Sequence, residues 1–323
     1  FTLGAAGTDT NLKKYKVFYK TGSSDVTEDD TPAGQIITAS YVEDALFAIE
    51  SLTANTQYVA NIWTYDNYNN KSKAVEIAKY TAAEVPTIPT VTASSTTSIN
   101  VTLGAGDGNP VATTYAIQEV NSWNFVQSDG TLSGSADWDT LSNWGTKTVT
   151  GLSANTQYAF KVQARNGDLT ETAFSSAVSK YTLALPVTSV GLIDATSSSA
   201  YGLTLTWNDA GQTGLKIDLS SVTGGACDDT YDVGDFDDAL DNTSSPKGVS
   251  ASANTCYKAR IQSYNGDGIL NTDNVAYGAS GVTTPPAQPT SLTNSDSDIN
   301  YITWGWDEVT DAANYKIYRS SDD

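Results

Sequence analysis

Apolar and polar residues alternate along short runs of this chain, and the runs recur at a fixed spacing. Four of them begin 100 residues apart, and they read Tyr15-Lys-Val-Phe-Tyr, Tyr115-Ala-Ile-Gln-Glu, Leu215-Lys-Ile-Asp-Leu and Tyr315-Lys-Ile-Tyr-Arg. Alternation with a period of two is typical of a half-buried β-strand. The pattern therefore predicts an equivalent strand at each of these positions, in units of one domain length.

A seven-residue phrase repeats at the same spacing. It reads Leu52-Thr-Ala-Asn-Thr-Gln-Tyr58, Leu152-Ser-Ala-Asn-Thr-Gln-Tyr158 and Ala251-Ser-Ala-Asn-Thr-Cys-Tyr257, and its tyrosines lie 100 and 99 residues apart. Each phrase ends one β-like run and opens another, which continues to Trp63, Val162 or Ile261. A period of this length indicates tandem domains and not a solenoid.

A Leu, a polar turn and a Tyr that opens the next strand are typical of a tyrosine corner. The chain resembles the fibronectin type III family in the form common in secreted bacterial and archaeal proteins. The resemblance implies an all-β chain of tandem fibronectin type III-like (immunoglobulin-like) β-sandwiches, arranged as beads on a rod. It also implies that the corner residues Tyr58, Tyr158 and Tyr257 pack in the sandwich while each hydroxyl bonds to backbone upstream.

Strand order and prolines place the domain boundaries near residues 83, 184 and 285. In the family's order the runs at 15, 115, 215 and 315 are third strands, and second strands precede them at 99–103, 203–207 and 302–304. Trp207 and Trp304 match a core tryptophan of the family, whereas Leu103 departs from it. Prolines follow each last strand, as expected of boundary positions, at Pro86, Pro89, Pro186, Pro285, Pro286 and Pro289.

Four modules follow from these boundaries. Module one (1–82) lacks its first strands, module two (83–183) and module three (184–284) are complete, and a terminal segment (285–323) holds the first three strands of a further module. A half sandwich exposes its core face and an unpaired edge. We therefore interpret the sequence as a stretch of a longer array, with completion by a neighbouring subunit as the alternative.

Length and charge agree with such an array. The chain has 323 residues, which suits roughly three sandwiches of about 100 residues, and 17 basic against 37 acidic residues give a net charge of −20. That charge disfavours nucleic acid and anionic membrane surfaces as partners. The sequence also has no run of 18 apolar residues, so no direct membrane insertion is expected of this stretch.

The chain contains no histidine, which removes Ser-His-Asp and Cys-His nucleophilic systems and His-ligated zinc from consideration. Paired carboxylates can hydrolyse glycosides, but the sequence singles out no such pair, and no nucleotide-binding fingerprint is present. We do not expect an enzyme or a bound cofactor, apart from calcium as discussed below.

The two cysteines, Cys227 and Cys256, both fall in module three. A lone pair in one module is compatible with a disulfide in an oxidising compartment, and a pair of buried free thiols is the alternative.

Two acidic stretches are candidate calcium sites, because clustered carboxylates repel one another unless solvated or bridged by a cation. The candidate ligands are Asp228, Asp229, Asp232, Asp235, Asp237, Asp267 and Asp273. For the dense stretch after Cys227, a solvated loop is the alternative. The stretch from Asn265 also fits a hairpin turn, in which Asn-Gly supplies positive φ, and Asn166-Gly-Asp168 is equivalent to it in module two.

Module two concentrates tryptophans at Trp123, Trp138 and Trp144. They are interface candidates, because exposed aromatic residues mark contact sites. A sugar-stacking platform and packing within the sandwich are the alternatives. Three Asn-x-Ser/Thr sequons give glycosylation candidates at Asn70, Asn100 and Asn242.

The fold favours a structural function at the cell surface or outside the cell. We expect a segment of a filament, sheath, surface layer or adhesin stalk whose partners are copies of itself or neighbouring modules of the array. This step rests on analogy of fold. The alternatives are accessory modules of a secreted polysaccharide-degrading enzyme, and a module that binds glycan or protein.

Overall fold

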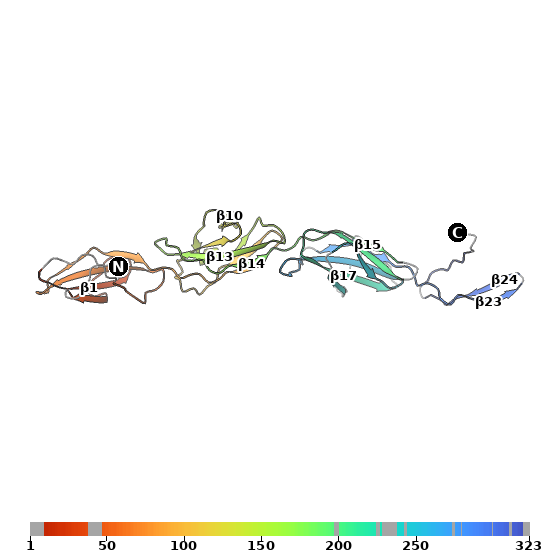
Figure 1. The fold of residues 1–323 in the computed structure, drawn as a ribbon, viewed down its shortest axis with the longest axis horizontal. Helices are drawn as coiled ribbons and strands as arrows, with labels where there is room; N and C mark the ends of the chain where they lie inside the picture. Colours follow the sequence, from red (N-terminus) through yellow and green to blue (C-terminus); the bar gives the residue numbers. More distant parts are fainter. Residues whose placement is uncertain are drawn as a thin grey trace. The chain divides into compact units, whose positions relative to one another are not determined.

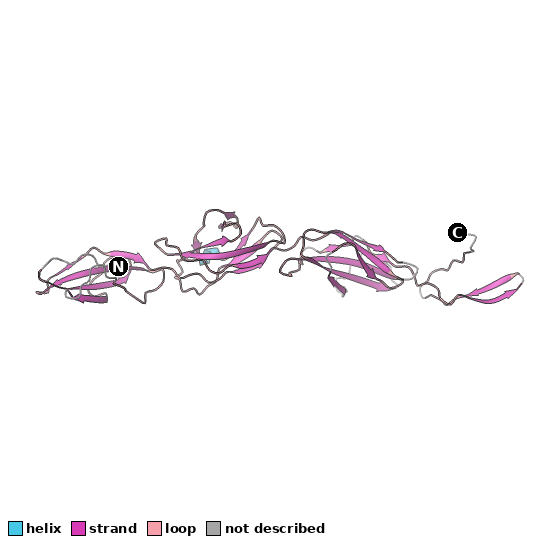
Figure 2. Cartoon of the chain, viewed as in Figure 1, coloured by secondary structure: helices cyan, strands magenta, loops and turns pink. Residues whose placement is uncertain are grey.

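A computed structural model describes most of the chain in two compact units. The first unit holds Phe1–Ser94, Ser98–Gly151 and Tyr158–Lys180, and the second holds Ser95–Thr97, Leu152–Gln157 and Tyr181–Asp323. The residues that the structure describes are 10–37, 47–196, 200–223, 227, 238–241, 244–272, 275–278, 280–298, 300–309 and 312–318. Within this part, strands dominate and the one helix is a single turn (Figure 2), as the alternating pattern predicted.

Module one contributes one five-stranded antiparallel sheet in the order β2-β1-β3-β4, with β5 also paired to β3. Its strands are β1 (Leu12–Thr21), β2 (Thr31–Ile37), β3 (Gln57–Asp66), β4 (Lys71–Lys73) and β5 (Ile77–Tyr80). Phe18 and Trp63 meet edge to face with ring centroids 5.2 Å apart. They form the centre of a small core with Val26, Val59 and Tyr65.

Module two contains two sheets. The three-stranded sheet has the order β12-β7-β6, and its strands are β6 (Thr90–Ala93), β7 (Ile99–Thr102) and β12 (Thr146–Val149). The second sheet has the order β10-β9-β8-β13-β14, with β11 also paired to β8. Its strands are β8 (Thr114–Glu119), β9 (Phe125–Val126), β10 (Leu132–Ser133), β11 (Asp139–Thr140), β13 (Gln157–Arg165) and β14 (Val178–Tyr181), with α1 (Leu141–Trp144) directly after β11. Figure 1 labels β10, β13 and β14 of this sheet.

Module three repeats the two-sheet arrangement. One sheet has the order β15-β16-β19, and its strands are β15 (Thr188–Asp194), β16 (Gly202–Asn208) and β19 (Lys247–Ser250). The other has the order β18-β17-β20-β21, with β22 also on β20, and its strands are β17 (Gly214–Thr223), β18 (Asp238–Asp241), β20 (Thr255–Tyr264), β21 (Ala276–Tyr277) and β22 (Val282–Thr283). One core cluster draws side chains from both sheets, including Leu205 and Trp207 from β16 and Ile217 and Ile261 from β17 and β20. Burial from both sheets is the signature of a β-sandwich.

The predicted strands are confirmed in modules one to three. The third strands are β1, β8 and β17, and each pairs with the strand that the phrase opens, namely β3, β13 and β20. The second strands are β7 and β16 in modules two and three. Trp207 is buried as predicted, and Leu103 fills the corresponding core position in module two.

The terminal segment departs from the prediction. Its first two strands form the hairpin β23 (Thr293–Asp298) and β24 (Tyr301–Gly305), but the residues from Tyr315 to Tyr318 are not a strand. In the described part of this segment no second sheet covers the hairpin, and Trp304 is 48% exposed. A strand without a ladder partner is not stable by itself, which explains why this third strand does not form.

No helix in the described residues has the length and apolar character needed to cross a membrane.

Candidate functional site

The repeated phrase adopts one backbone conformation in all three modules. Its asparagines, Asn55, Asn155 and Asn254, have positive φ angles of 40°, 45° and 48°. Asn tolerates this left-handed region because its short side chain can bond locally. Each backbone N–H then donates across to the segment that leaves the module, at Ala82 O, Leu183 O and Pro285 O.

The following threonine of each phrase is bonded to a second threonine just after the last strand. Thr56 N donates to Thr81 Oγ1 at 3.0 Å, and Thr81 Oγ1 donates to Thr53 O at 2.6 Å. The same two bonds recur between Thr156, Thr182 and Ser153 in module two, and between Thr255, Thr284 and Ser252 in module three. We call this arrangement the threonine knot. It satisfies backbone groups that a tight turn would otherwise leave unpaired.

The partner threonines were missed by sequence reasoning, although a signal exists. Thr81, Thr182 and Thr284 follow the phrase threonines by 25, 26 and 29 residues. Each lies directly after the last strand of its module and shortly before the boundary prolines. The sequence of this region was used only to place the domain boundaries, so the hydrogen bonds of these threonines were not predicted.

The hydrogen bond of the tyrosine corner is formed at Tyr58 and at Tyr257. Thr53 N donates to the hydroxyl oxygen of Tyr58 at 3.1 Å, and Ser252 N donates to that of Tyr257 at 2.7 Å. Tyr158 holds the equivalent place at the start of β13 and is half-buried. In module one the tyrosine hydroxyl bonds to the backbone N–H of Thr53, and the threonine knot bonds to the C=O of the same residue.

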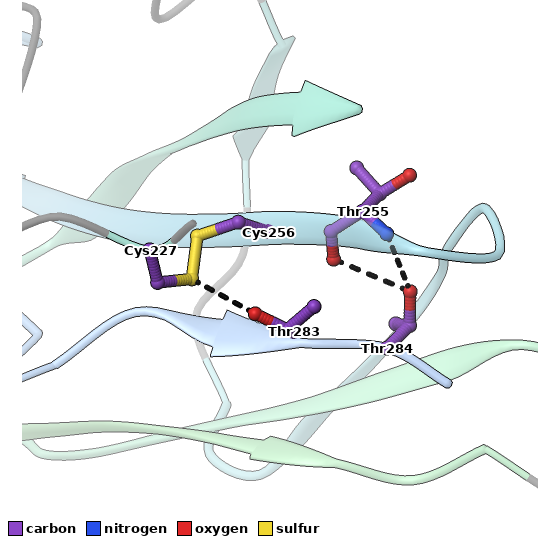
Figure 3. The surroundings of a disulfide bond; sticks show 5 residues. All are labelled: Cys227, Thr255, Cys256, Thr283 and Thr284. Atoms are coloured by element: carbon purple, nitrogen blue, oxygen red, sulfur yellow. Dashed lines mark hydrogen bonds between the residues drawn. A yellow bond between two sulfur atoms is a disulfide. The ribbon is translucent and has the colours of Figure 1, made fainter. Parts of the chain in front are cut away.

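The structure joins Cys227 and Cys256 in a disulfide with Cα atoms 5.5 Å apart (Figure 3). Thr283 Oγ1 lies 3.2 Å from Cys227 Sγ, and the adjacent Thr284 Oγ1 accepts a bond from Thr255 N at 3.1 Å. Because Cys256 lies inside the third phrase, the disulfide ties Cys227 to the same turn that carries the threonine knot.

The tryptophans of module two do not form one surface platform. Trp144 is 3% exposed, and its Nε1 donates to Tyr115 O at 2.8 Å, so it belongs to the core. Its assignment as an interface candidate is therefore wrong, because α1 places the ring inside the sandwich. Trp123 is 68% exposed with Lys161 Nζ 5.2 Å from its ring centroid, and Trp138 is half-buried with Arg165 stacked at 4.5 Å.

The calcium candidates remain predictions. Asp228, Asp229, Asp232, Asp235, Asp237 and Asp273 lie outside the described residues. The Oδ2 atom of Asp267 accepts a hydrogen bond from Tyr181 N at 2.9 Å. Across the described ranges, no three His, Cys, Asp or Glu side chains come together as a metal site.

Two of the three sequons can be placed. Asn70 is exposed, and its Nδ2 donates to Asp66 Oδ2 at 2.8 Å. Asn100 lies on β7, where its Oδ1 accepts a bond from Thr148 Oγ1 at 2.8 Å. Asn242 lies outside the described residues.

Two buried tyrosines make the fold sensitive to alkali. Burial and a hydrogen bond to Glu28 raise the pKa of Tyr65 to about 12, and burial with a bond to Asp107 raises the pKa of Tyr115 well above its usual range. An unfolded tyrosine ionises near pH ~10. The stability contributed by Tyr65 is thus complete below that pH and is lost as the pH rises towards the folded value.

We expect the melting temperature of the chain to fall between pH ~10 and ~12, partly through this residue. Tyr65→Phe should flatten the fall, because the variant has no hydroxyl to ionise. Parallel melting curves over this pH range measure the difference, and equal slopes for the two proteins would contradict the assignment.

The chain was compared with known protein families, solved structures and curated proteins. Residues 84–180 match the model of the family described as fibronectin type III domain. Among solved structures, the chain is similar to a crystal structure of chicken CNTN1 FN1–FN3 domains, with 14% identity and a TM-score of 0.33 over 86% of this chain and 90% of that chain. No curated protein matches the sequence.

Proposed function

Because the chain is built of fibronectin type III-like β-sandwich repeats, with residues 84–180 matching the family model, we propose that it is an extracellular structural protein. Its role is to form a segment of a filament, sheath, surface layer or adhesin stalk, in contact with copies of itself or with neighbouring modules. Fibronectin type III domains are generally extracellular modules with structural or adhesive functions, which supports a non-catalytic role for this chain.

The observation that carries the proposal is the threonine knot. The same bonds close module one at Thr81, module two at Thr182 and module three at Thr284. Each module is thus stabilised by its own local device at the point where the chain leaves it. Stability supplied module by module suits an array that acts through its length and repetition.

Two further features support an extracellular setting. The disulfide between Cys227 and Cys256 is of a kind that persists in oxidising compartments and is rare in the cytosol. The net charge of −20 favours solubility and disfavours nucleic acid. The glycan-binding alternative loses support, because Trp144 is buried in the core.

The proposal is tested on intact cells of the source organism with an antibody raised against the chain. We expect labelling of unpermeabilised cells or of material shed from them, while an antibody against a cytoplasmic protein gives none. Labelling that requires permeabilisation would contradict an extracellular role. Alkylation before and after reduction of the extracted protein provides a second readout, because the cysteine pair should react only after reduction.

A further inference from the structure

In the first compact unit, the phrase of module one contacts a turn of module two. The Oδ1 atom of Asn55 accepts a hydrogen bond from Gly167 N at 2.9 Å, and its Nδ2 donates to Thr113 Oγ1 at 2.8 Å. Both ends of one amide are therefore engaged by groups more than 50 residues away. Gly167 lies in the turn after β13, and Thr113 directly precedes β8.

Two side chains of this turn form hydrogen bonds with the backbone at the end of module one. Asp168 Oδ2 accepts from Tyr80 N at 3.1 Å, and Asn166 Nδ2 donates to Thr81 O at 3.0 Å. Lys79 Nζ also lies 3.4 Å from Asp168 Oδ2, but Lys79 is mostly exposed and such a pair contributes little. The bonds to the backbone define the geometry, because they require the carboxylate and the amide at fixed places.

Gly167 is required by close packing in this arrangement. A Cβ atom there would lie 2.3 Å from Cζ of the Tyr80 ring, which is far inside van der Waals contact. A hairpin turn predicts positive φ at the Asn-Gly pair. In this turn the residue with positive φ is instead Leu169, at 64°. The glycine is therefore explained by the neighbouring module's tyrosine and not by the turn itself.

The same set of contacts recurs within the second compact unit. Asn155 Oδ1 accepts from Gly266 N at 2.9 Å, and Asn155 Nδ2 donates to Thr213 Oγ1 at 3.0 Å. Asp267 Oδ2 accepts from Tyr181 N at 2.9 Å, as Asp168 does from Tyr80. The remaining two contacts repeat as well: Asn265 Nδ2 donates to Thr182 O at 3.1 Å, and a Cβ on Gly266 would lie 2.5 Å from Cζ of Tyr181.

Module one has a turn of the same shape with a different sequence. Asp66 Oδ1 accepts from Tyr68 N and Asn70 N, just as Asn166 Oδ1 accepts from Asp168 N and Thr170 N. The next two positions hold Asn67 and Tyr68, where the other turns hold Gly and Asp. The turn therefore forms without Gly-Asp, whereas both turns that contact a preceding module carry Gly-Asp.

We propose that the Asn-Gly-Asp turn is a docking element that recognises the preceding module of the array. Its partner is a fibronectin type III-like module that ends in an Ala-Asn-Thr phrase and a Tyr-Thr pair. The phrase asparagine accepts a hydrogen bond from the glycine N–H, and the turn aspartate accepts one from the tyrosine N–H. The tyrosine ring excludes any residue with a Cβ atom at the glycine position. Docking of this kind holds module two in one orientation against module one. This inference does not rest on the proposed extracellular location.

Spin labels on the full chain test the docking. The described cysteines are both in the disulfide, so exposed sites such as Val75 in module one and Ser176 in module two can carry labels as Val75→Cys and Ser176→Cys. We expect a narrow distance distribution between the labels. Gly167→Ala should replace it with a broad one, because the added Cβ collides with Tyr80.

Two further variants and a matched control complete the design. Asp168→Ala removes the bond to Tyr80 N, and Asn55→Gly removes the bonds to Gly167 N and Thr113 Oγ1. The glycine keeps the positive φ that residue 55 needs, so both variants should also broaden the distribution. Asn67→Ala changes the equivalent position of the module-one turn, which takes no part in the contact between modules one and two, and should leave the distribution narrow. Circular dichroism monitors folding of each variant. A narrow distribution in the folded docking variants, or a broad one in the parent chain, would overturn the proposal.

Discussion

Trp144→Ala should lower the free energy of unfolding of module two by about 3–5 kcal/mol, the cost typical of removing a large buried aromatic side chain. The ring is 3% exposed, and Nε1 donates to Tyr115 O on β8. The substitution therefore leaves a cavity and removes a buried hydrogen bond to this carbonyl. Hydrogen exchange of peptides from β8 and β13 measures the loss in this module separately from the others.

Trp123→Ala is the matched control for this experiment. Trp123 is 68% exposed, so its removal should change the unfolding free energy by no more than about 0.5 kcal/mol. Alanine replaces it at the same positive φ of 61°, which leaves the backbone requirement unchanged between the parent and the variant. If exchange in β8 and β13 were equally slow in both variants, Trp144 would not be part of the core.

Loss of the disulfide between Cys227 and Cys256 should destabilise module three by roughly 3–4 kcal/mol, since the bond closes a loop with a sequence separation of 29. The effect should concentrate on β20, which carries Cys256, and on β22, which pairs with it. Urea unfolding with and without reductant, followed by hydrogen exchange of β20 and β22, measures the change.

The double variant Cys227→Ala/Cys256→Ala separates this effect from any general action of the reductant. It should be as unstable as the reduced parent chain, and adding reductant should not change it further. Modules one and two serve as internal references, because both cysteines lie in module three. An equal loss of protection in β13 would show that the reductant acts elsewhere than on the disulfide.

The sequence was sufficient to predict features that depend on local pattern. Alternation predicts β1, β8 and β17, since one face of each strand is buried. The phrase predicts a turn followed by a strand, because Asn favours the left-handed conformation observed at Asn55 and Asn155.

Features that depend on contacts between distant segments were not predictable in the same way. The environment of Trp144 depends on α1, which is a single turn and therefore too short to produce a periodic pattern of apolar residues. The need for glycine at Gly167 arises from the ring of Tyr80, 87 positions earlier in the printed sequence. The strand expected at Tyr315 is absent because strand formation depends on a partner as well as on pattern.

The position of the threonine knot determines where the chain resists mechanical tension. A force that pulls on the chain after module one would peel β5 away from β3, starting at Thr81, which directly follows β5. That residue and its neighbour Ala82 are bonded to the phrase through Thr53, Asn55 and Thr56. Peeling must therefore break this group of hydrogen bonds before it reaches the β5–β3 ladder, so the load falls first on the turn that modules one to three share.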